Sequence, residues 1–450
     1  MTRILVRPAA KALTGSVPVP SDKSIGHRAF IFGAFARGKS RVKGFSYGED
    51  NVSTMRGFES MGVQVEDDGH GVVVVHGQGL ASLTAPAGPI DCGNSGTTMR
   101  LVAGVLAAQP FRSHMIGDAS LSKRPMGRIA RPLRARGASI EGAIHPVRKE
   151  EITAPLVIGP LAPGTRLQGL EYKIPVSSAQ VKSALLLSGL FANGPTVVFE
   201  PLLSRDHTER MLSALGAPIR AAGTMVSLEP PDDPKILADF DIDLPGDLSA
   251  AAFLLVAAQL VPGSLVTTRR TGLNPTRSGI IDVIRLLGGT IAAEPQGDVL
   301  GEPIGLTTGK YSELRGGAVG GELATRSIDE IPIAAALAAR ARGTTEFSDV
   351  GELRVKESDR IARIVALLRD FGLNVDESPE GFRVEGKPDG ALRAARVESH
   401  GDHRIAMTAC ILGLVADGET VVEDADCIAT SFPKFVGTLR ALGADLEVAT

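Results

Sequence analysis

The sequence predicts an α/β protein made from six copies of one unit, arranged as two similar halves. Six apolar, helix-like stretches each end in a short Gly signature and lead into a β-like stretch. These signatures recur roughly every 70 to 85 residues, which indicates one repeated supersecondary unit. The same order of elements surrounds every signature, and this mixed order is typical of the α/β or α+β class. The signature glycines are Gly62, Gly137, Gly216, Gly288, Gly372 and Gly443.

Each element of the unit has its own signal. The first helix is rich in Ala and Leu and usually ends at a Gly turn, as at 260–263, because Gly adopts the left-handed conformation that stops a helix. A short β-branched strand follows, as at 196–199. The second helix has one apolar face, with the i, i+3, i+4, i+7 spacing seen at 361–368. The last strand alternates, as at 138–141.

Two extended, Pro-containing stretches mark the boundary between the halves. They lie near 18–21 and 240–246, and each precedes a helix of the first type. Three copies lie between these crossovers and three follow them. We therefore expect an N-terminal domain at 20–241 and a C-terminal domain made of 1–19 together with 242–450.

Composition excludes several function classes. The chain has 450 residues, of which 43% are hydrophobic and 22% charged, and a net charge of −3. It lacks the basic excess of nucleic-acid-binding proteins and an apolar run of the roughly 18 residues that span a membrane. Three widely spaced cysteines predict neither a disulfide framework nor a metal site. The N-terminus enters a strand-like pattern without a targeting segment, so we expect a cytoplasmic protein.

The helix starts differ strongly between copies, and many carry a cation. Free N–H groups and the helix dipole make a helix start suitable for phosphate and carboxylate. Lys356 and Arg360 are four residues apart, which predicts one shared helical face. The repeated placement of cations indicates a small polyanionic ligand. The cations are Lys23, Arg28, Arg100, Lys123, Arg124, Arg205, Lys356, Arg360 and Arg404.

A purely structural interpretation exists for each of these residues taken singly. Asp22, Ser24, Asn94 and Ser177 lie where helix caps are common. Gly96 fits a tight turn, and Lys356 with Arg360 fits a solvated surface with paired charges. The recurrence of such residues at the same point of the repeat favours function over structure.

Several segments that contain these residues form longer motifs. They are Asp22-Lys23-Ser24-Ile25, Gly93-Asn94-Ser95-Gly96-Thr97, Lys123-Arg124-Pro125-Met126-Gly127-Arg128, Ser178-Ala179-Gln180-Val181-Lys182, Lys356-Glu357-Ser358-Asp359-Arg360 and Asp402-His403-Arg404. Together these motifs closely resemble one family, the 3-phosphoshikimate 1-carboxyvinyltransferases or EPSP synthases, in their bacterial class II branch. The resemblance runs from Lys11 to about Glu447.

The resemblance implies a two-domain inside-out α/β barrel built from βαβαββ-type units, three in each domain. It implies transfer of the enolpyruvyl group of phosphoenolpyruvate to the 5-hydroxyl of shikimate 3-phosphate, in the shikimate pathway to chorismate and aromatic amino acids. It further implies that phosphate is released, that no cofactor or metal is required, that the two substrates are the only partners of a monomer, and that glyphosate targets the enzyme.

The resemblance also implies the role of each site residue. The catalytic set is Lys23, Asp329 and Glu357. The ligands of phosphoenolpyruvate are Lys23, Arg124, Lys356, Arg360 and Arg404. The ligands of shikimate 3-phosphate are Ser24, Arg28, Ser178, Gln180 and Arg205, and Gly96 and Asp329 complete the substrate-binding set. The division of proton transfers between Asp329 and Glu357 stays open.

Two positions depart from patterns found in parts of the family, and both affect the expected binding of anionic ligands. Thr430 stands where class I members carry a Lys, so the anion contact of that Lys is absent or supplied elsewhere. Gly96 is kept where some glyphosate-insensitive class II members carry Ala, which predicts that a steric block to glyphosate is missing.

Two alternative functions have distinct signatures. The related UDP-N-acetylglucosamine enolpyruvyltransferases commonly use a Cys in the loop of copy two, but the stretch from Arg112 to Arg124 contains none. A non-catalytic repeat protein that binds a polyanion has no use for carboxylates among its cations, which disfavours it because of Asp329 and Glu357.

Overall fold

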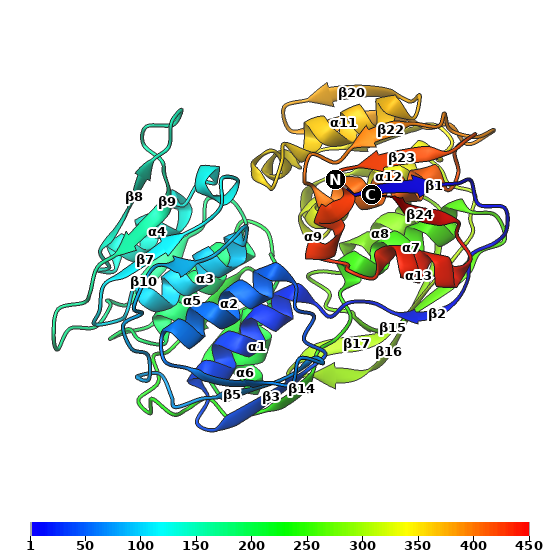
Figure 1. Cartoon of the computed structure of the whole chain (residues 1–450). Coiled ribbons are helices and arrows are strands. Elements are labelled where there is room, and N and C mark those ends of the chain that lie inside the picture. The colour runs from blue at the N-terminus through cyan, green and yellow to red at the C-terminus, as the bar shows by residue number, and fades with distance from the viewer. Residues whose placement is uncertain (1, 450) are drawn as a thin grey trace. The chain divides into compact units, whose positions relative to one another are not determined.

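The computed structural model describes residues 2 to 449 and divides into two compact units (Figure 1). Unit 1 contains the chain up to Pro20, Pro245–Gly297 and the chain from Pro303 onward. Unit 2 contains Ser21–Leu244 and the short segment Asp298–Glu302. Most of unit 1 is thus C-terminal, while one of its strands comes from the N-terminal end of the chain.

Within residues 2 to 449 there are six four-stranded sheets of one topology, three in each unit. In each sheet an edge strand pairs parallel with its neighbour, as β6 (Ile90–Asp91) does with β7 (Ser113–Ile116). The other pairs are antiparallel, as between β7, β9 (Ile152–Ile158) and β8 (Ile140–Ile144). The elements of a complete copy run β-α-β-α-β-β, so the predicted βαβαββ unit is confirmed.

Unit 2 contains copies one to three. Copy one comprises β14 (Asp241–Asp243), α1 (Lys23–Phe35), β3 (Lys39–Lys43), α2 (Glu49–Ser60), β4 (Gln64–Asp67) and β5 (Val72–His76). Copy two comprises β6, α3 (Gly96–Leu106), β7, the 3-10 turn η1 (Leu121–Lys123), α4 (Gly127–Ala135), β8 and β9. Copy three comprises β10 (Leu170–Lys173), α5 (Ala179–Gly189), β11 (Thr196–Phe199), α6 (His207–Ala214), β12 (Ile219–Ala222) and β13 (Met225–Leu228).

Unit 1 contains copies four to six. Copy four comprises β2 (Thr14–Pro18), α7 (Leu248–Leu260), β15 (Leu265–Gly272), α8 (Gly279–Leu286), β16 (Thr290–Val299) and β17 (Glu302–Lys310). Copy five comprises β18 (Ala318–Val319), α9 (Gly321–Arg326), η2 (Ile328–Glu330), α10 (Ile331–Ala339), β19 (Thr344–Phe347), η3 (Gly351–Val355), α11 (Arg360–Asp370), β20 (Asn374–Ser378) and β21 (Gly381–Glu385). Copy six comprises β22 (Arg396–Glu398), α12 (His403–Gly413), β23 (Thr420–Glu423), η4 (Ala425–Thr430), α13 (Phe435–Leu442), β24 (Leu446–Ala449) and β1 (Arg3–Val6).

Two strands belong to one unit, while the helix that follows each of them in the chain belongs to the other. Strand β2 precedes α1, yet it pairs parallel with β15 of copy four. Strand β14 precedes α7, yet it pairs parallel with β3 of copy one. Strand β2 therefore belongs to a sheet of unit 1, and the chain then enters unit 2. Strand β14 belongs to a sheet of unit 2, and the chain then returns to unit 1.

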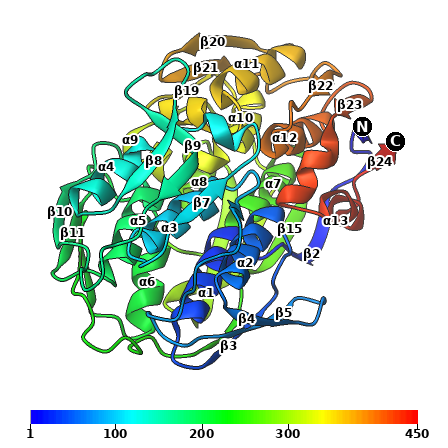
Figure 2. The same ribbon diagram turned by 60° about the vertical axis from the view of Figure 1, so that its left-hand side comes forward.

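The first helices of the copies form the interior, and the sheets lie outside them. Every residue of α7, α10 and α12 is buried; in Figure 2 these helices lie inside the strands of copies five and six. A helix that is enclosed on all sides must be apolar all round, and α7 and α10 consist mainly of Ala, Leu and Ile. The predicted inside-out arrangement is confirmed. Among residues 2 to 449, no helix combines the length and apolar character needed to cross a bilayer.

The six signature glycines share one conformation. Their φ angles lie between 83° and 108°, and each follows the second helix of its copy. An L-residue with a Cβ is strained in this region, whereas Gly is not. The repeat is therefore visible in the sequence because the same helix stop is used six times.

The tip of the β16–β17 hairpin was not anticipated from the sequence. Asp298–Glu302 groups with unit 2 although both strands of the hairpin run largely within unit 1. The carboxylate of Glu302 pairs with Nδ1 of His207 at 2.8 Å, and both side chains are 1% exposed. His207 therefore holds the hairpin tip through a contact between residues far apart in the chain.

Candidate active site

The predicted site residues form two clusters, one within each unit. The unit 2 cluster lies at or just before the starts of α1, α3, α4, α5 and α6 and contains Lys23, Ser24, Arg28, Gly96, Arg124, Ser178, Gln180 and Arg205. The unit 1 cluster lies at or near the starts of α10, α11 and α12 and contains Asp329, Lys356, Glu357, Arg360 and Arg404.

Helix α1 begins with two of the predicted ligands. Asp22 caps the helix by accepting a hydrogen bond from the N–H of Ile25 at 3.0 Å, so the hydroxyl of Ser24 does not serve as that cap. Lys23 pairs with Asp50 of α2 at 2.7 Å and keeps 27% of its side chain exposed. The start of α1 therefore presents a partly exposed ammonium and a hydroxyl next to each other.

Arg28 lies one turn further along α1 and is almost fully buried. Its guanidinium donates to Thr208 Oγ1 at 2.7 Å, to the carbonyl of Ser24 at 2.8 Å and to Ser183 Oγ at 2.7 Å. All three acceptors are neutral. Burial lowers the pKa of Arg28 to about 10, and the nearby charge of Arg205 contributes in the same direction. Two predicted ligands from copies one and three thus lie within electrostatic range of each other.

The starts of α3 and α5 are joined through Gln180. Its amide nitrogen donates to Thr97 Oγ1 at 2.8 Å, and its carbonyl oxygen accepts from Arg100. A Cβ on Gly96 would lie 3.2 Å from Nη1 of Arg100 and 3.3 Å from Nη1 of Arg124. The absence of a side chain at Gly96 therefore leaves room for two guanidiniums beside the first turn of α3.

Arg124 and Ser178 of the unit 2 cluster have neutral partners. Arg124 is 8% exposed and donates to the side chains of Asn94 and Ser120. Ser178 caps α5 by accepting from the N–H of Val181 at 3.4 Å. For Ser178 the structure therefore shows the capping role that is common for this residue type, in addition to its place in the cluster.

In unit 1 the guanidinium of Arg360 is surrounded by carboxylates. It lies 2.9 Å from Asp402, 2.5 Å from Glu357 and 3.6 Å from Asp329, and its side chain is 1% exposed. Burial opposes the charged form of Arg360, but the three carboxylates together raise its pKa. Burial likewise opposes the charge of Asp402, yet Arg360 holds the pKa of that carboxyl below its usual value. Arg360 and Asp402 thus form a buried, fully charged pair.

The predicted helical spacing of Lys356 and Arg360 is wrong. Helix α11 begins only at Arg360, with Asp359 as its cap, and Lys356 has an extended backbone. The cap explains the difference, since Asp359 accepts from the N–H of Ala362 and stops the helix from extending backwards. The two cations nevertheless meet at Asp329, which lies 3.5 Å from Lys356 and 3.6 Å from Arg360.

Arg404 connects α12 to the residues around η2. It donates to the carbonyl of Asp329 at 2.7 Å and lies 3.8 Å from the carboxylate of Glu330. The side chain of Glu330 is 1% exposed and also lies 3.6 Å from Arg277, whereas that of Asp329 is 15% exposed. Of the two adjacent acids, Asp329 is therefore the one that faces Lys356 and Arg360.

Sequence reasoning missed the residues that hold Arg404 in place. Ser249 accepts from Arg277 at 2.7 Å and from Arg404 at 3.4 Å, and Asp247 pairs with Arg277 at 2.7 Å. These residues lie at the starts of the two helices of copy four. In the other copies, the candidate site residues are polar residues at helix starts. The same reasoning, applied to copy four, would have found these residues.

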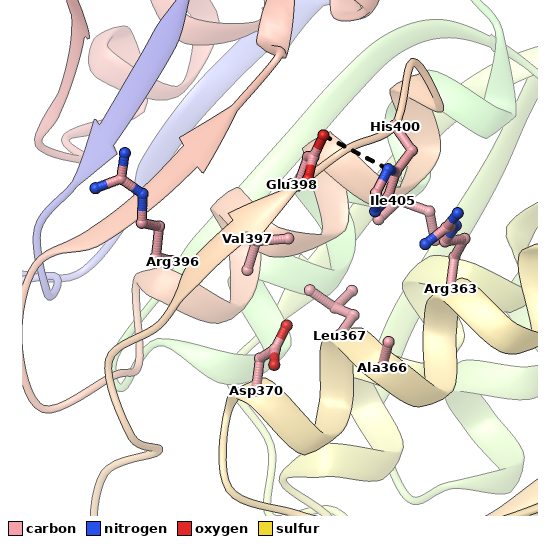
Figure 3. Close-up of a pocket in the computed structure, with 9 residues that line it drawn as sticks. All are labelled: Arg363, Ala366, Leu367, Asp370, Arg396, Val397, Glu398, His400 and Ile405. Atoms are coloured by element: carbon pink, nitrogen blue, oxygen red, sulfur yellow. Dashed lines mark ion pairs between the residues drawn. The ribbon is translucent and has the colours of Figure 1, made fainter.

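One pocket lies outside both clusters. It is lined by residues of α11, β22 and α12 and the intervening turn, and Figure 3 shows Glu398 and His400 facing each other across part of it, at 3.6 Å. None of the predicted site residues lines it. Among residues 2 to 449, no group of three or more His, Cys, Asp or Glu side chains is placed to hold a metal ion.

Comparison with known proteins extends these observations to the whole chain. The family model described as EPSP synthase (3-phosphoshikimate 1-carboxyvinyltransferase) matches residues 8–439. Curated proteins named 3-phosphoshikimate 1-carboxyvinyltransferase include one from Geobacter sp. (strain M21), 47% identical over 98% of this chain and 99% of its own length. Another, from Bacillus thuringiensis (strain Al Hakam), is 44% identical over 98% of this chain and 100% of its own length.

The fold comparison agrees. The solved EPSP synthase from Acinetobacter baumannii superposes with a TM-score of 0.87 at 40% identity and covers 100% of both chains. The chain therefore belongs to the EPSP synthase (3-phosphoshikimate 1-carboxyvinyltransferase) family, enzymes of the shikimate pathway that transfer the enolpyruvyl group of phosphoenolpyruvate to shikimate 3-phosphate.

Proposed function

We propose that the two clusters divide the work of this enolpyruvyl transfer, with the unit 2 cluster binding shikimate 3-phosphate and the unit 1 cluster carrying the proton transfers. The observation that supports this division most directly is the environment of Arg360. There the two carboxylates of Asp329 and Glu357 converge on one buried guanidinium, an arrangement that pure anion binding does not need.

The reaction requires an acid and a base. In the addition step the 5-hydroxyl oxygen of shikimate 3-phosphate bonds to C2 of phosphoenolpyruvate and loses its proton, while C3 gains a proton. In the elimination step C3 loses a proton, the C2–O bond to phosphate breaks, and phosphate leaves. We assign these transfers to Asp329 and Glu357 as a pair, since a positioned carboxyl group can serve in both directions. Lys23 is the third catalytic group of the proposal, beside the departing phosphate.

Arg360 couples binding of phosphoenolpyruvate to this acid–base pair. Its guanidinium already pairs with three carboxylates, and a bidentate contact with the substrate carboxylate occupies two of its donors. The substrate carboxylate would therefore exchange with Glu357 or Asp329, and the released side chain becomes available for proton transfer. Arg404 and Lys356 complete the anion contacts in unit 1.

The unit 2 cluster supplies the charges for phosphate. Arg28 and Arg205 bind the phosphate of shikimate 3-phosphate, and Ser24, Ser178 and Gln180 bind its remaining polar groups in this proposal. Lys23 and Arg124 face the phosphate of phosphoenolpyruvate, beside Gly96. Neutral partners hold both Arg28 and Arg124, so their charge is available for the substrates.

The proposal also covers the compartment, the oligomeric state and the domain roles of the enzyme. We infer a cytoplasmic monomer that uses no cofactor and binds no nucleic acid, with an N-terminal domain for shikimate 3-phosphate at 20–241 and a C-terminal domain for phosphoenolpyruvate made of 1–19 and 242–450. All three cysteines are free thiols, which fits a reducing compartment. Light scattering at two protein concentrations tests the monomer, and a second, dimeric species contradicts it.

Phosphate release on mixing the protein with phosphoenolpyruvate and shikimate 3-phosphate tests the proposal. The wild type should release phosphate, and Glu357→Gln should lower kcat by about 10²- to 10⁴-fold because it removes a proton-transfer group. Glu377→Gln is the matched control, since Glu377 pairs with Arg354 at 3.0 Å and is 35% exposed, and it should keep full activity. An unchanged kcat in Glu357→Gln contradicts the proton-transfer role of Glu357. Phosphate release that occurs only with a UDP-sugar acceptor contradicts shikimate 3-phosphate as the substrate.

A further inference from the structure

Lys182 carries a buried charge that the proposed reaction does not use. It lies on α5, one turn after Ser178, and its side chain is 1% exposed. Removing an ammonium from water costs several kcal/mol, and a well-packed apolar side chain in its place is often neutral or stabilising. A role beyond packing is therefore a reasonable expectation for Lys182.

Three acceptors from different segments surround its ammonium group. Nζ lies 2.5 Å from Oε1 of Glu200, at the end of β11, and 2.7 Å from Oε1 of Glu209 on α6. The third is the carbonyl of Ser204, which accepts a hydrogen bond at 3.3 Å. One side chain thus joins α5, the end of β11, the following loop and α6.

The loop held in this way ends at a predicted substrate ligand. Ser204 is bound at three points: its N–H donates to Glu200 at 3.4 Å, its hydroxyl donates to the same carboxylate, and its carbonyl accepts from Lys182. The next residue is Arg205. Lys182 and Glu200 therefore fix the backbone from which the side chain of Arg205 projects.

A second line of contacts leads from Lys182 to Arg28. The residue after Lys182 is Ser183 and the residue before Glu209 is Thr208, and their hydroxyls are 2.7 Å apart. Lys182–Glu209 and Ser183–Thr208 are thus adjacent contacts between α5 and α6. Both hydroxyls accept hydrogen bonds from the guanidinium of Arg28, so the α5–α6 spacing sets the position of this guanidinium.

Lys182 also affects how strongly two buried carboxylates attract the guanidinium of Arg28. Glu200 and Glu209 are both buried, and Glu209 lies within electrostatic range of Arg28. Because the ammonium of Lys182 pairs with both carboxylates, it weakens their attraction for the guanidinium of Arg28. Without Lys182, Arg28 and Arg210 are cations within electrostatic range of Glu209.

We propose that Lys182 is a positioning residue for the phosphate group of shikimate 3-phosphate: it fixes the Ser204–Arg205 backbone and keeps two buried carboxylates away from the phosphate-binding guanidiniums. The assignment of Arg28 and Arg205 to this phosphate rests on the proposed function. Lys182 itself touches no substrate in this role.

The test is Lys182→Met, with separate measurements of kcat and of KM for each substrate. We expect the KM for shikimate 3-phosphate to rise roughly tenfold or more, with the KM for phosphoenolpyruvate and kcat changed by less than about threefold. Arg136→Met is the matched control. Arg136 is another fully buried cation that contacts α5, but at its opposite end, through the carbonyl of Leu185 and the hydroxyl of Ser188. This control should lower the urea midpoint without changing either KM.

A pH series separates positioning from general damage. In Lys182→Met the carboxylate of Glu209 stays buried, within electrostatic range of Arg28 on α1, Arg210 on α6 and Asp206 at the start of α6. Burial raises the pKa of Glu209, and the loss of the Lys182 ammonium acts in the same direction, so this carboxylate takes up a proton as the pH falls. We expect the ratio of variant to wild-type KM for shikimate 3-phosphate to shrink between pH 8 and pH 6. Lys182→Met/Glu209→Gln should have an intermediate KM, and it serves as the test if the single variant does not fold.

The outcomes distinguish this inference from the proposed function. If the wild type releases no phosphate, the proposed function fails. If the wild type is active but Lys182→Met keeps the wild-type KM for shikimate 3-phosphate, only the positioning role fails. Equal rises in both KM values, matched by Arg136→Met, would likewise overturn it and leave Lys182 as a structural residue.

Discussion

The two clusters hold their cations in opposite ways. In unit 2, Arg28 and Arg124 are bound by hydroxyl, carbonyl and amide oxygens. In unit 1, Arg360 is bound by three carboxylates and Arg404 lies beside the carboxylate of Glu330. Lys23 is intermediate, since it pairs with Asp50 but stays partly exposed. Both clusters lie at helix starts, so position in the repeat does not explain the difference.

The difference fits the proposed division between anion binding in unit 2 and acid–base chemistry in unit 1. A cation held by neutral groups keeps its full charge for a phosphate, which suits the unit 2 cluster to a polyanion. A cation held by carboxylates is neutralised, but its partners are the groups that can accept or donate a proton. The same type of helix start thus serves two purposes, depending on which residues other copies bring to it.

The largest expected effect concerns the loss of one buried guanidinium from each unit. Arg360→Met leaves the carboxylate of Asp402 buried without its cation and should lower the free energy of unfolding by about 3–5 kcal/mol. Arg28→Met leaves three neutral acceptors, the carbonyl of Ser24 and the hydroxyls of Thr208 and Ser183, which still bind each other at 2.7 Å. It should lower the free energy of unfolding by about 1–3 kcal/mol. Urea denaturation followed by circular dichroism measures both. Equal losses would contradict the contrast between the units.

An effect of intermediate size concerns the loss of folding stability as the pH falls. Burial lowers the pKa of His27 in unit 2 to about 3, whereas an unfolded His titrates near 6.5. Between these values the unfolded chain binds more protons, so His27 removes roughly 1.4 kcal/mol of stability per pH unit as the pH falls below about 6.5. His27→Gln should flatten the decline of stability between pH 6.5 and 5, and identical slopes in the two proteins would refute this.

Asp402 provides the unit 1 counterpart. Its pKa lies below the usual value because of Arg360, so its stabilisation is complete above the unfolded value of about 3.9 and is lost as the pH falls further. Asp402→Asn should therefore leave the slope between pH 6.5 and 5 unchanged. The two substitutions together show which unit responds first to acid.

The smallest effect concerns Gly96. An added methyl would lie 3.2 Å from Arg100 and 3.3 Å from Arg124, so both guanidiniums must shift by a few tenths of an ångström. Gly96→Ala should raise the KM for phosphoenolpyruvate roughly three- to tenfold and reduce inhibition by glyphosate more strongly. Gly437→Ala, in open space on α13, should change neither. Unaltered glyphosate inhibition in Gly96→Ala would contradict the steric argument.

Much of the fold could be predicted because its signals are local. The glycine stops, the apolar faces and the polar helix starts each depend on a few neighbouring residues, so the six βαβαββ copies could be recognised. Strands β2 and β14, in contrast, pair with strands that lie far from them in the chain. Both strands were expected to connect the halves, but pairing of β2 with β15 and of β14 with β3 has no local signal.

The candidate site was predicted as a set of residues and less well as a set of contacts. Lys356 and Arg360 do meet, but at Asp329 and not along one helix. Ser249 and Lys182 were not expected to contribute, because a Ser or a Lys near an apolar helix has many ordinary explanations. Ser249 meets Arg404 of copy six, whereas Lys182 meets two carboxylates of its own copy, and only the folded chain shows these contacts.

The sequence by itself determined the repeated unit and the residues that stand at each helix start, since backbone propensity and amphipathic spacing act over a few residues. The tertiary structure decided whether each of those cations meets a hydroxyl or a carboxylate. That choice depends on distance and burial between segments that the fold brings together, and it distinguishes the proposed phosphate-binding cluster from the proposed acid–base cluster at the same position of the repeat.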